Sequence, residues 1–153
     1  KREVLMNYQF IRDYMGSPIA QFDMGSETFS RWFSEELCDD QEKINVILAA
    51  IEQLNNEKIK VFELQGKEIC LSLDPYEVEV RSTRLEIEAP EDLPEGTEIY
   101  DQESISGCGL EDFAHVLQAW NEFIAGKLSK ILRHFHKLLF YLFWVQYSLY
   151  HRL

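Results

Sequence analysis

The sequence predicts an α+β protein, in which an antiparallel sheet of about six strands carries helices on one face and an apolar helix follows at the C-terminal end. Three observations support this prediction. Apolar and polar residues alternate near the N-terminus and again over residues 58–88, as in strands with one buried face. Between these regions and after residue 109, apolar residues recur every three or four positions, as in helices. The strands and helices therefore fall in separate runs, which favours an antiparallel sheet.

The N-terminal region is predicted to form a hairpin. Residues 7–12 and 19–24 alternate as strands do, and the segment between them, Asp-Tyr-Met-Gly-Ser-Pro, has the composition of a turn. Two helices should follow. The first begins at Gly25-Ser26 with Ser26 as its N-cap, and the second begins near Asp39, three residues before Glu42, in a capping-box pattern.

The two helices each carry one apolar stripe. The second helix is expected to end at Asn55-Asn56. The stripes comprise Phe29, Trp32, Phe33 and Leu37 in the first helix and Ile44, Ile47, Leu48, Ile51 and Leu54 in the second. At this spacing Trp32, like Trp120 later in the chain, is expected to lie in the core.

Four more strands are expected at 58–64, 68–73, 77–81 and 84–88, as two hairpins with turns at 65–67 and 82–83. Residues 89–106 read as an irregular acidic segment. Gly107-Cys108-Gly109 should then open a third helix, which Gly126 should end. The apolar stripe of this helix is Leu110, Phe113, Leu117, Trp120 and Ile124.

Charge divides the chain into two parts. Of the 153 residues, the first 126 contain 10 Lys/Arg against 27 Asp/Glu, a net of −17, whereas the last 27 contain 5 Lys/Arg and no acid. An anionic body of this size repels phosphate backbones, so we do not expect it to bind nucleic acid directly. A basic protein or a ribonucleoprotein is the kind of partner that fits.

Cysteine usage and the N-terminus favour a cytoplasmic protein. Cys38, Cys70 and Cys108 form no CxxC pattern and are expected to be free, inert thiols in a reducing compartment. The first ten residues contain neither an apolar core nor a small-residue cleavage site, so no secretory signal is predicted there.

No catalytic residue, cofactor or metal ligand can be assigned from the sequence, so an enzyme is not favoured. Gly107 and Gly109 lack the other elements of a phosphate loop, and Cys108 lies seven residues from His115, too far for a predicted catalytic pair. The candidate partner-binding residues are instead six acids in the irregular segment. They are Glu91, Asp92, Glu95, Glu98, Asp101 and Glu103.

Two blocks of sequence resemble a known family. MNYQFIRDYMGSPIAQFDMGSETFSRWFSEEL, residues 6–37, and IYDQESISGCGLEDFAHVLQAWNEFI, residues 99–124, are similar to the YacL family of short acidic proteins from gammaproteobacteria. The resemblance implies a bacterial protein of a family without an assigned function, so it transfers no site residue. The resemblance covers residues 6 to about 127. We therefore expect an acidic α+β domain over 6–127, followed by a basic, aromatic helical tail over 128–153. Neither this tail nor residues 1–5 are expected in the family.

The tail admits three interpretations. Residues 138–150 would form about 20 Å of helix, too short to span a hydrocarbon core of about 30 Å, so no transmembrane segment is predicted. The helix could pack on its own body or on another subunit. It could lie in a membrane interface, since basic residues precede it. It could also arise from read-through, a frameshift or a gene-model error.

Three functional hypotheses follow. The first is a non-enzymatic cytoplasmic binding or adaptor module that engages a basic macromolecule. The second is an enzyme that uses a carboxylate cluster with a divalent metal, formed by Asp101, Glu103, Glu111 and Asp112. The third is a structural homo-oligomer joined through the third helix or the tail.

Overall fold

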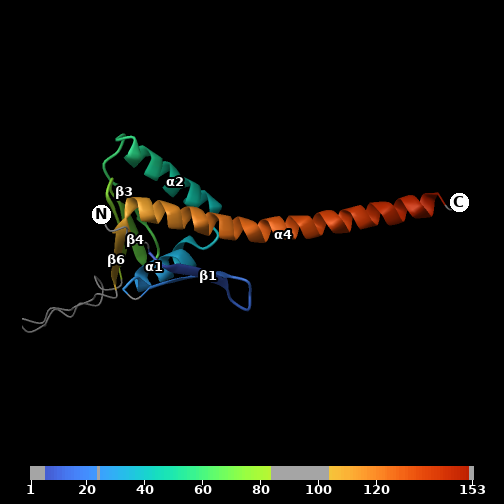
Figure 1. The fold of residues 1–153 in the computed structure, drawn as a ribbon, viewed down its shortest axis with the longest axis horizontal. Coiled ribbons are helices and arrows are strands. Elements are labelled where there is room, and N and C mark those ends of the chain that lie inside the picture. The colour runs from blue at the N-terminus through green and yellow to red at the C-terminus, as the bar shows by residue number, and fades with distance from the viewer. Residues whose placement is uncertain (1–5, 24, 84–103, 152–153) are drawn as a thin grey trace, which may run out of the picture.

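The computed structural model describes residues 6–23, 25–83 and 104–151, with the backbone only at 127–133. It confirms the α+β class (Figure 1). The described strands form two antiparallel sheets, a hairpin of two strands and a sheet of four, where the sequence analysis expected a single sheet.

The N-terminal hairpin consists of β1 (Tyr8–Arg12) and β2 (Pro18–Phe22), paired from Tyr8 opposite Phe22 to Arg12 opposite Pro18. The Asp13 carboxylate organises its turn, because its Oδ1 accepts hydrogen bonds from the backbone N–H groups of Met15 and Ser17, both at 2.8 Å. The predicted hairpin is therefore confirmed, and its turn chemistry is that of an aspartate side chain bonding to the backbone just after it.

The larger sheet has the strand order β3-β4-β5-β6. Its strands are β3 (Phe62–Gln65), β4 (Ile69–Leu73), β5 (Glu77–Ser82) and β6 (Ile105–Gly109). Strand β6 lies where an irregular segment and a helix start were predicted, and its two glycines explain why the sequence did not indicate a strand. The strands that pair with β5 are β4 and β6, while the strand predicted at 84–88 lies outside the described residues.

One face of this sheet forms the floor of the core. Ile69, Leu71 and Leu73 of β4, with Val78 and Val80 of β5, are buried. The intervening residues of β5 point the other way and are more exposed. Helices therefore cover a single face, as predicted.

The first helical region changes its hydrogen-bonding pattern within two turns. Helix α1 (Glu27–Arg31) passes into a π-helical segment, η1 (Trp32–Leu37), in which the Cys38 N–H donates to the carbonyl of Phe33, five residues back, at 2.9 Å. The expected cap is wrong, since the Ser26 side chain makes no capping hydrogen bond. Cys38 ends the segment with a positive φ of 49°, and its carbonyl accepts a 2.8 Å hydrogen bond from the Trp120 indole.

Helix α2 (Gln41–Asn55) starts one residue later than the capping-box pattern indicated. Its N-cap is Asp40, whose Oδ1 accepts from the Lys43 N–H at 3.0 Å, so the predicted cap at Asp39 is wrong. The apolar stripe is confirmed, because Ile44, Ile47 and Leu54 are fully buried.

Aromatic side chains fill the core between the sheet and the helices. Trp32 and Trp120 are 1% and 0% exposed, which confirms that both tryptophans are core residues. The Trp120 ring lies edge-on to Phe10 of the hairpin at 5.0 Å and to Phe33 of η1 at 5.5 Å. The last helix thus holds the hairpin and the first helical region together.

Helix α4 (Leu110–Tyr150) continues through Gly126, so the predicted stop at this glycine is wrong. A glycine inside a helix costs only about 1 kcal/mol relative to alanine, and the good helix formers around Gly126 offset that cost. Figure 1 shows α4, coloured orange to red, lying against the body over its first half and extending beyond it over its second half. Among the helices of the described ranges, none is both long and apolar enough to cross a membrane.

Candidate functional site

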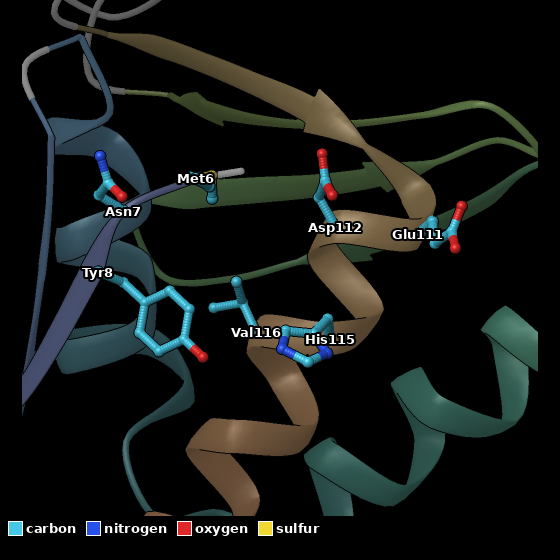
Figure 2. A pocket seen from close by; sticks show the side chains of 7 residues that line it. All are labelled: Met6, Asn7, Tyr8, Glu111, Asp112, His115 and Val116. Atoms are coloured by element: carbon cyan, nitrogen blue, oxygen red, sulfur yellow. The ribbon is translucent and has the colours of Figure 1, made fainter. Parts of the chain in front are cut away.

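A pocket of about 480 Å³ lies where the N-terminal segment passes the first turns of α4. Figure 2 shows its two walls, one from the segment that leads into β1 and one from the helix. Its lining combines apolar, aromatic, amide, acidic and imidazole side chains. They belong to Met6, Asn7, Tyr8, Glu111, Asp112, His115 and Val116.

The helical wall of the pocket is formed by the first turns of α4, directly after β6. Gly109 is the N-cap with an extended backbone, and the next N–H, that of Leu110, donates to the carbonyl of Tyr76 at 3.0 Å. This contact fixes the start of the helix against the sheet. Side chains four residues apart share a helical face, so Glu111 aligns with His115, and Asp112 aligns with Val116, one turn further on.

The opposite wall is held in place by two contacts outside the pocket. The Asn7 side-chain amide donates to Oδ2 of Asp23 at 2.8 Å, and the Tyr8 ring stacks on Phe10 with 4.8 Å between ring centroids. Phe10 in turn packs against Trp120 of α4. The segment is therefore coupled to the same helix that forms the other wall.

The pocket is acidic. Two of its seven lining residues, Glu111 and Asp112, are carboxylic acids, and none is Lys or Arg. In the described part of the chain the ion pairs join Arg31 to Glu35 and Glu68, Lys43 to Asp40, and Arg81 to Glu79, so neither pocket carboxylate belongs to one. Both carboxylates are thus available to a ligand.

The nearby thiol is protonated. Burial and the negative charge of Asp112 raise the pKa of Cys108 to about 12. A thiol with this pKa supplies almost no thiolate near neutral pH, which disfavours Cys108 as a nucleophile. Cys108 does not line this pocket, whereas His115 does.

The predicted site residues divide between the pocket and the segment outside the described ranges. Glu91, Asp92, Glu95, Glu98, Asp101 and Glu103 all lie outside them. Of the proposed metal-binding cluster, only Glu111 and Asp112 are described, and the described residues contain no group of three or more potential metal ligands.

Part of the pocket could have been found from the sequence. Glu111 and His115 are four apart on a strongly predicted helix, and this spacing indicates a shared face. The other wall comes from Met6, Asn7 and Tyr8, about a hundred residues away. The packing of Phe10 on Trp120 and Phe123, together with the hydrogen bond from Arg12 to the Phe123 carbonyl, brings these residues to α4.

The acidity extends beyond the pocket. In the described ranges up to residue 126 there are 18 Asp/Glu and 7 Lys/Arg, a net charge of −11. Several of the acids have structural roles as turn and helix caps, such as Asp13, Asp40 and Asp74. Within the described ranges Glu111 and Asp112 cap no turn through a side-chain hydrogen bond, and they add to the anionic field of the body.

Comparison with known proteins places the chain beside bacterial relatives. A family model described as an uncharacterised protein family, UPF0231, matches residues 6–124. A UPF0231 protein of Yersinia enterocolitica is 41% identical over 122 residues, which is 80% of this chain and 100% of the relative. Relatives from Serratia proteamaculans and Proteus mirabilis are 39% and 40% identical, over 78% of this chain and 98% and 95% of their own lengths. No solved structure shows significant similarity.

Proposed function

We propose a function for this chain, which belongs to the uncharacterised protein family UPF0231, from its candidate site. The proposed function is that of a non-enzymatic, cytoplasmic binding module. It engages a basic macromolecule by accepting a Lys or Arg side chain in the pocket. We include in this proposal the identification of the family as YacL, since both sequence blocks that resemble it fall inside the matched residues 6–124. The observation that carries the proposal is the pair of carboxylates in a pocket wall that contains no Lys or Arg.

The mixed lining suits a long cationic side chain. Lys and Arg have apolar stems and charged heads, so their stems can lie along Met6 and Val116 while their heads reach the carboxylates. The Tyr8 ring offers a face for a cation, an interaction that contributes about 0.5–1 kcal/mol at an exposed site. Glu111 and Asp112 then form charge-assisted hydrogen bonds with the ammonium or guanidinium group.

The anionic body supports the same partner chemistry at longer range. A net charge of −11 over the described body attracts cations and raises the rate at which a basic partner arrives. The six acids from Glu91 to Glu103 precede β6 in the sequence and would add further negative charge to this field. They remain part of the proposal as a second contact region for the same basic partner.

The proposal can be tested by titrating the full chain with a fluorescent deca-lysine peptide and an equally long Gly-Ser peptide. Glu111→Gln combined with Asp112→Asn should weaken deca-lysine binding about five- to thirtyfold, because each partly exposed ion pair contributes about 0.5–1 kcal/mol. The matched control is Glu42→Gln with Glu63→Gln, which removes the same charge from exposed positions outside the pocket. The control should lose about twofold or less.

Two results would count against the function. Equal loss in both double variants would show that net charge alone attracts the peptide, without a role for the pocket. Binding that does not weaken when salt rises from 50 to 300 mM would show that ion pairing does not drive the association, since screening shortens the range of exposed charges to a few ångströms. Affinity capture from cytoplasmic extract at the same two salt concentrations would then identify the natural partner.

A further inference from the structure

The exposed half of α4 carries an apolar stripe that we call the seam, formed by Phe135, Leu138, Leu142, Val145 and Leu149. We propose that two copies of the chain associate through this seam, with the two helices antiparallel. The association is independent of the proposed pocket function. The seam residues step by three and four positions, which is the spacing of helices that interlock along one face.

The seam continues the face that α4 buries in its own body. Leu110, Phe113, Leu117, Trp120 and Ile124 lie on the buried face and are at most 8% exposed. At 3.6 residues per turn, the seam projects from the same side of the helix. Over the first half of α4 this side is covered by the hairpin and η1, as the Trp120 contacts with Phe10 and Phe33 show.

Nothing in the described part of the chain covers the seam. Phe135, Leu138, Leu142 and Leu149 are 62%, 49%, 62% and 65% exposed. Figure 1 shows this half of the helix extending away from the sheet and from α2. A helix that is apolar over most of its circumference is normally buried, so the seam has the character of a surface that is missing its partner.

The area is sufficient for a second copy. The seam and its neighbours Leu139 and Tyr141 expose roughly 700 Å² per chain, from side-chain areas of about 150–200 Å² and the exposed fractions of these residues. Two copies would bury roughly 1,400 Å² in total, within the range of about 1,200–2,000 Å² for stable, specific interfaces. A single exposed patch on a monomer is usually about 300–600 Å².

The distribution of polar residues favours another helix over a membrane surface. A helix lying in a lipid interface needs one continuous charged face opposite its apolar face. In the exposed half of α4 the few polar residues are spread around the helix, as successive 100° steps place Lys137 and Ser148 on one side, Gln146 on the opposite side and His136 between them. Aromatic residues occupy the side opposite the seam, among them Phe140 and Phe143.

Charge determines the antiparallel orientation. A parallel pair would place two bodies side by side, each with a net charge of −11 over its described residues up to 126. In an antiparallel pair the overlapping segments 134–150 separate the bodies by about 25 Å of helix. That distance exceeds the screening length of about 8 Å at physiological salt, so the repulsion between the bodies becomes small.

The test is sedimentation equilibrium of the full chain between 1 and 100 μM. The unmodified chain should sediment as a dimer, and Leu138→Lys with Leu142→Lys should raise the dissociation constant at least about a hundredfold, because two apolar contacts per chain are replaced by charges. The matched control, Phe140→Lys with Phe143→Lys, adds the same charge on the opposite side and should remain dimeric. Circular dichroism should show helix in both variants, since the substituted residues lie outside the core.

Orientation is read from cross-linking. Phe135→Cys mixed with Leu149→Cys should form a disulfide between chains, whereas Phe135→Cys alone should not, because antiparallel helices place position 135 opposite 149. A disulfide in the Phe135→Cys chain alone would overturn the orientation. A monomer at every concentration would overturn the association, as would a monomer that co-floats with phosphatidylcholine–phosphatidylserine vesicles, since that result assigns the apolar helix to lipid.

Discussion

Replacing Glu36 with alanine should lower the free energy of unfolding by about 2–4 kcal/mol, because its carboxylate holds the turn between β3 and β4. Oε1 accepts hydrogen bonds from the N–H groups of Glu68 at 2.7 Å and Ile69 at 3.1 Å, and Oε2 accepts from the Lys67 N–H at 2.9 Å. The turn lies more than thirty residues away along the chain, so this one side chain ties η1 to the sheet.

The magnitude follows from the three bonds and their exposure. A hydrogen bond to a charged group contributes about 1.5–3 kcal/mol when buried, and a buried N–H left without a partner costs about 1–3 kcal/mol. The bond to Lys67 is exposed and the other two are half-buried, so we expect the sum to be well below three full contributions. Glu36→Gln keeps one acceptor oxygen without the charge and should cost about 1–2 kcal/mol.

The assay is urea unfolding of the full chain, followed by tryptophan fluorescence. Glu35→Ala is the matched control, because Glu35 is the neighbouring residue, has a side chain 61% exposed and, among the described residues, makes a 3.7 Å ion pair with Arg31. An exposed pair of this kind contributes about 0.5 kcal/mol or less. The reasoning is refuted if Glu36→Ala and Glu35→Ala lower the stability by the same amount within about 0.5 kcal/mol.

Three further predictions concern the fold and the thiol. Gly66→Ala should lower the free energy of unfolding by at least about 2 kcal/mol in the same urea assay, because a Cβ there would collide with the Glu36 carboxylate and the Ile69 carbonyl. A decrease below about 0.5 kcal/mol would contradict this close approach. Trp120→Phe should cost about 1–3 kcal/mol by thermal unfolding, since it leaves the Cys38 carbonyl without its indole donor, and an unchanged melting temperature would oppose this role. Cys108 should react with iodoacetamide at pH 8 far more slowly than in the urea-unfolded chain. The pKa of Cys108 is about 12 in the folded chain, above its value near 9 in the unfolded chain. The thiol's contribution to stability should therefore be complete below pH 9 and should decline by up to about 1.4 kcal/mol per pH unit between pH 9 and pH 12. A stability that does not change over that pH range would contradict the burial of the thiol.

The periodicity of the sequence was enough to predict the hairpin, α2 and the body half of α4, because each has a strong repeat of apolar residues. Periodicity did not indicate β6, where two glycines in five residues weaken the strand signal. It also did not indicate the π-helical segment, in which the Cys38 N–H donates to the carbonyl of Phe33 and the Phe33 ring packs on Trp120. Capping was misplaced by one residue at Asp40, since two adjacent aspartates are equivalent in the sequence.

The candidate site was less accessible to prediction than the fold. The sequence placed Glu111 and Asp112 in a possible carboxylate cluster with Asp101 and Glu103, not in a pocket shared with the N-terminal segment. The wall formed by Met6, Asn7 and Tyr8 depends on contacts between the two ends of the matched region, and no local pattern reports such contacts. Long-range packing, which is the least visible feature of a single sequence, therefore creates the site.

The most direct measurement of the central claim is a ¹⁵N-NMR titration of the full chain with the deca-lysine peptide at low salt. If the acidic pocket accepts a basic side chain, the amide signals of residues 6–8 and 111–116 should shift first and saturate together, and the Glu111→Gln with Asp112→Asn variant should lose those shifts. Saturating shifts confined to α2, or to residues 134–150, with the pocket signals unmoved, would contradict the account.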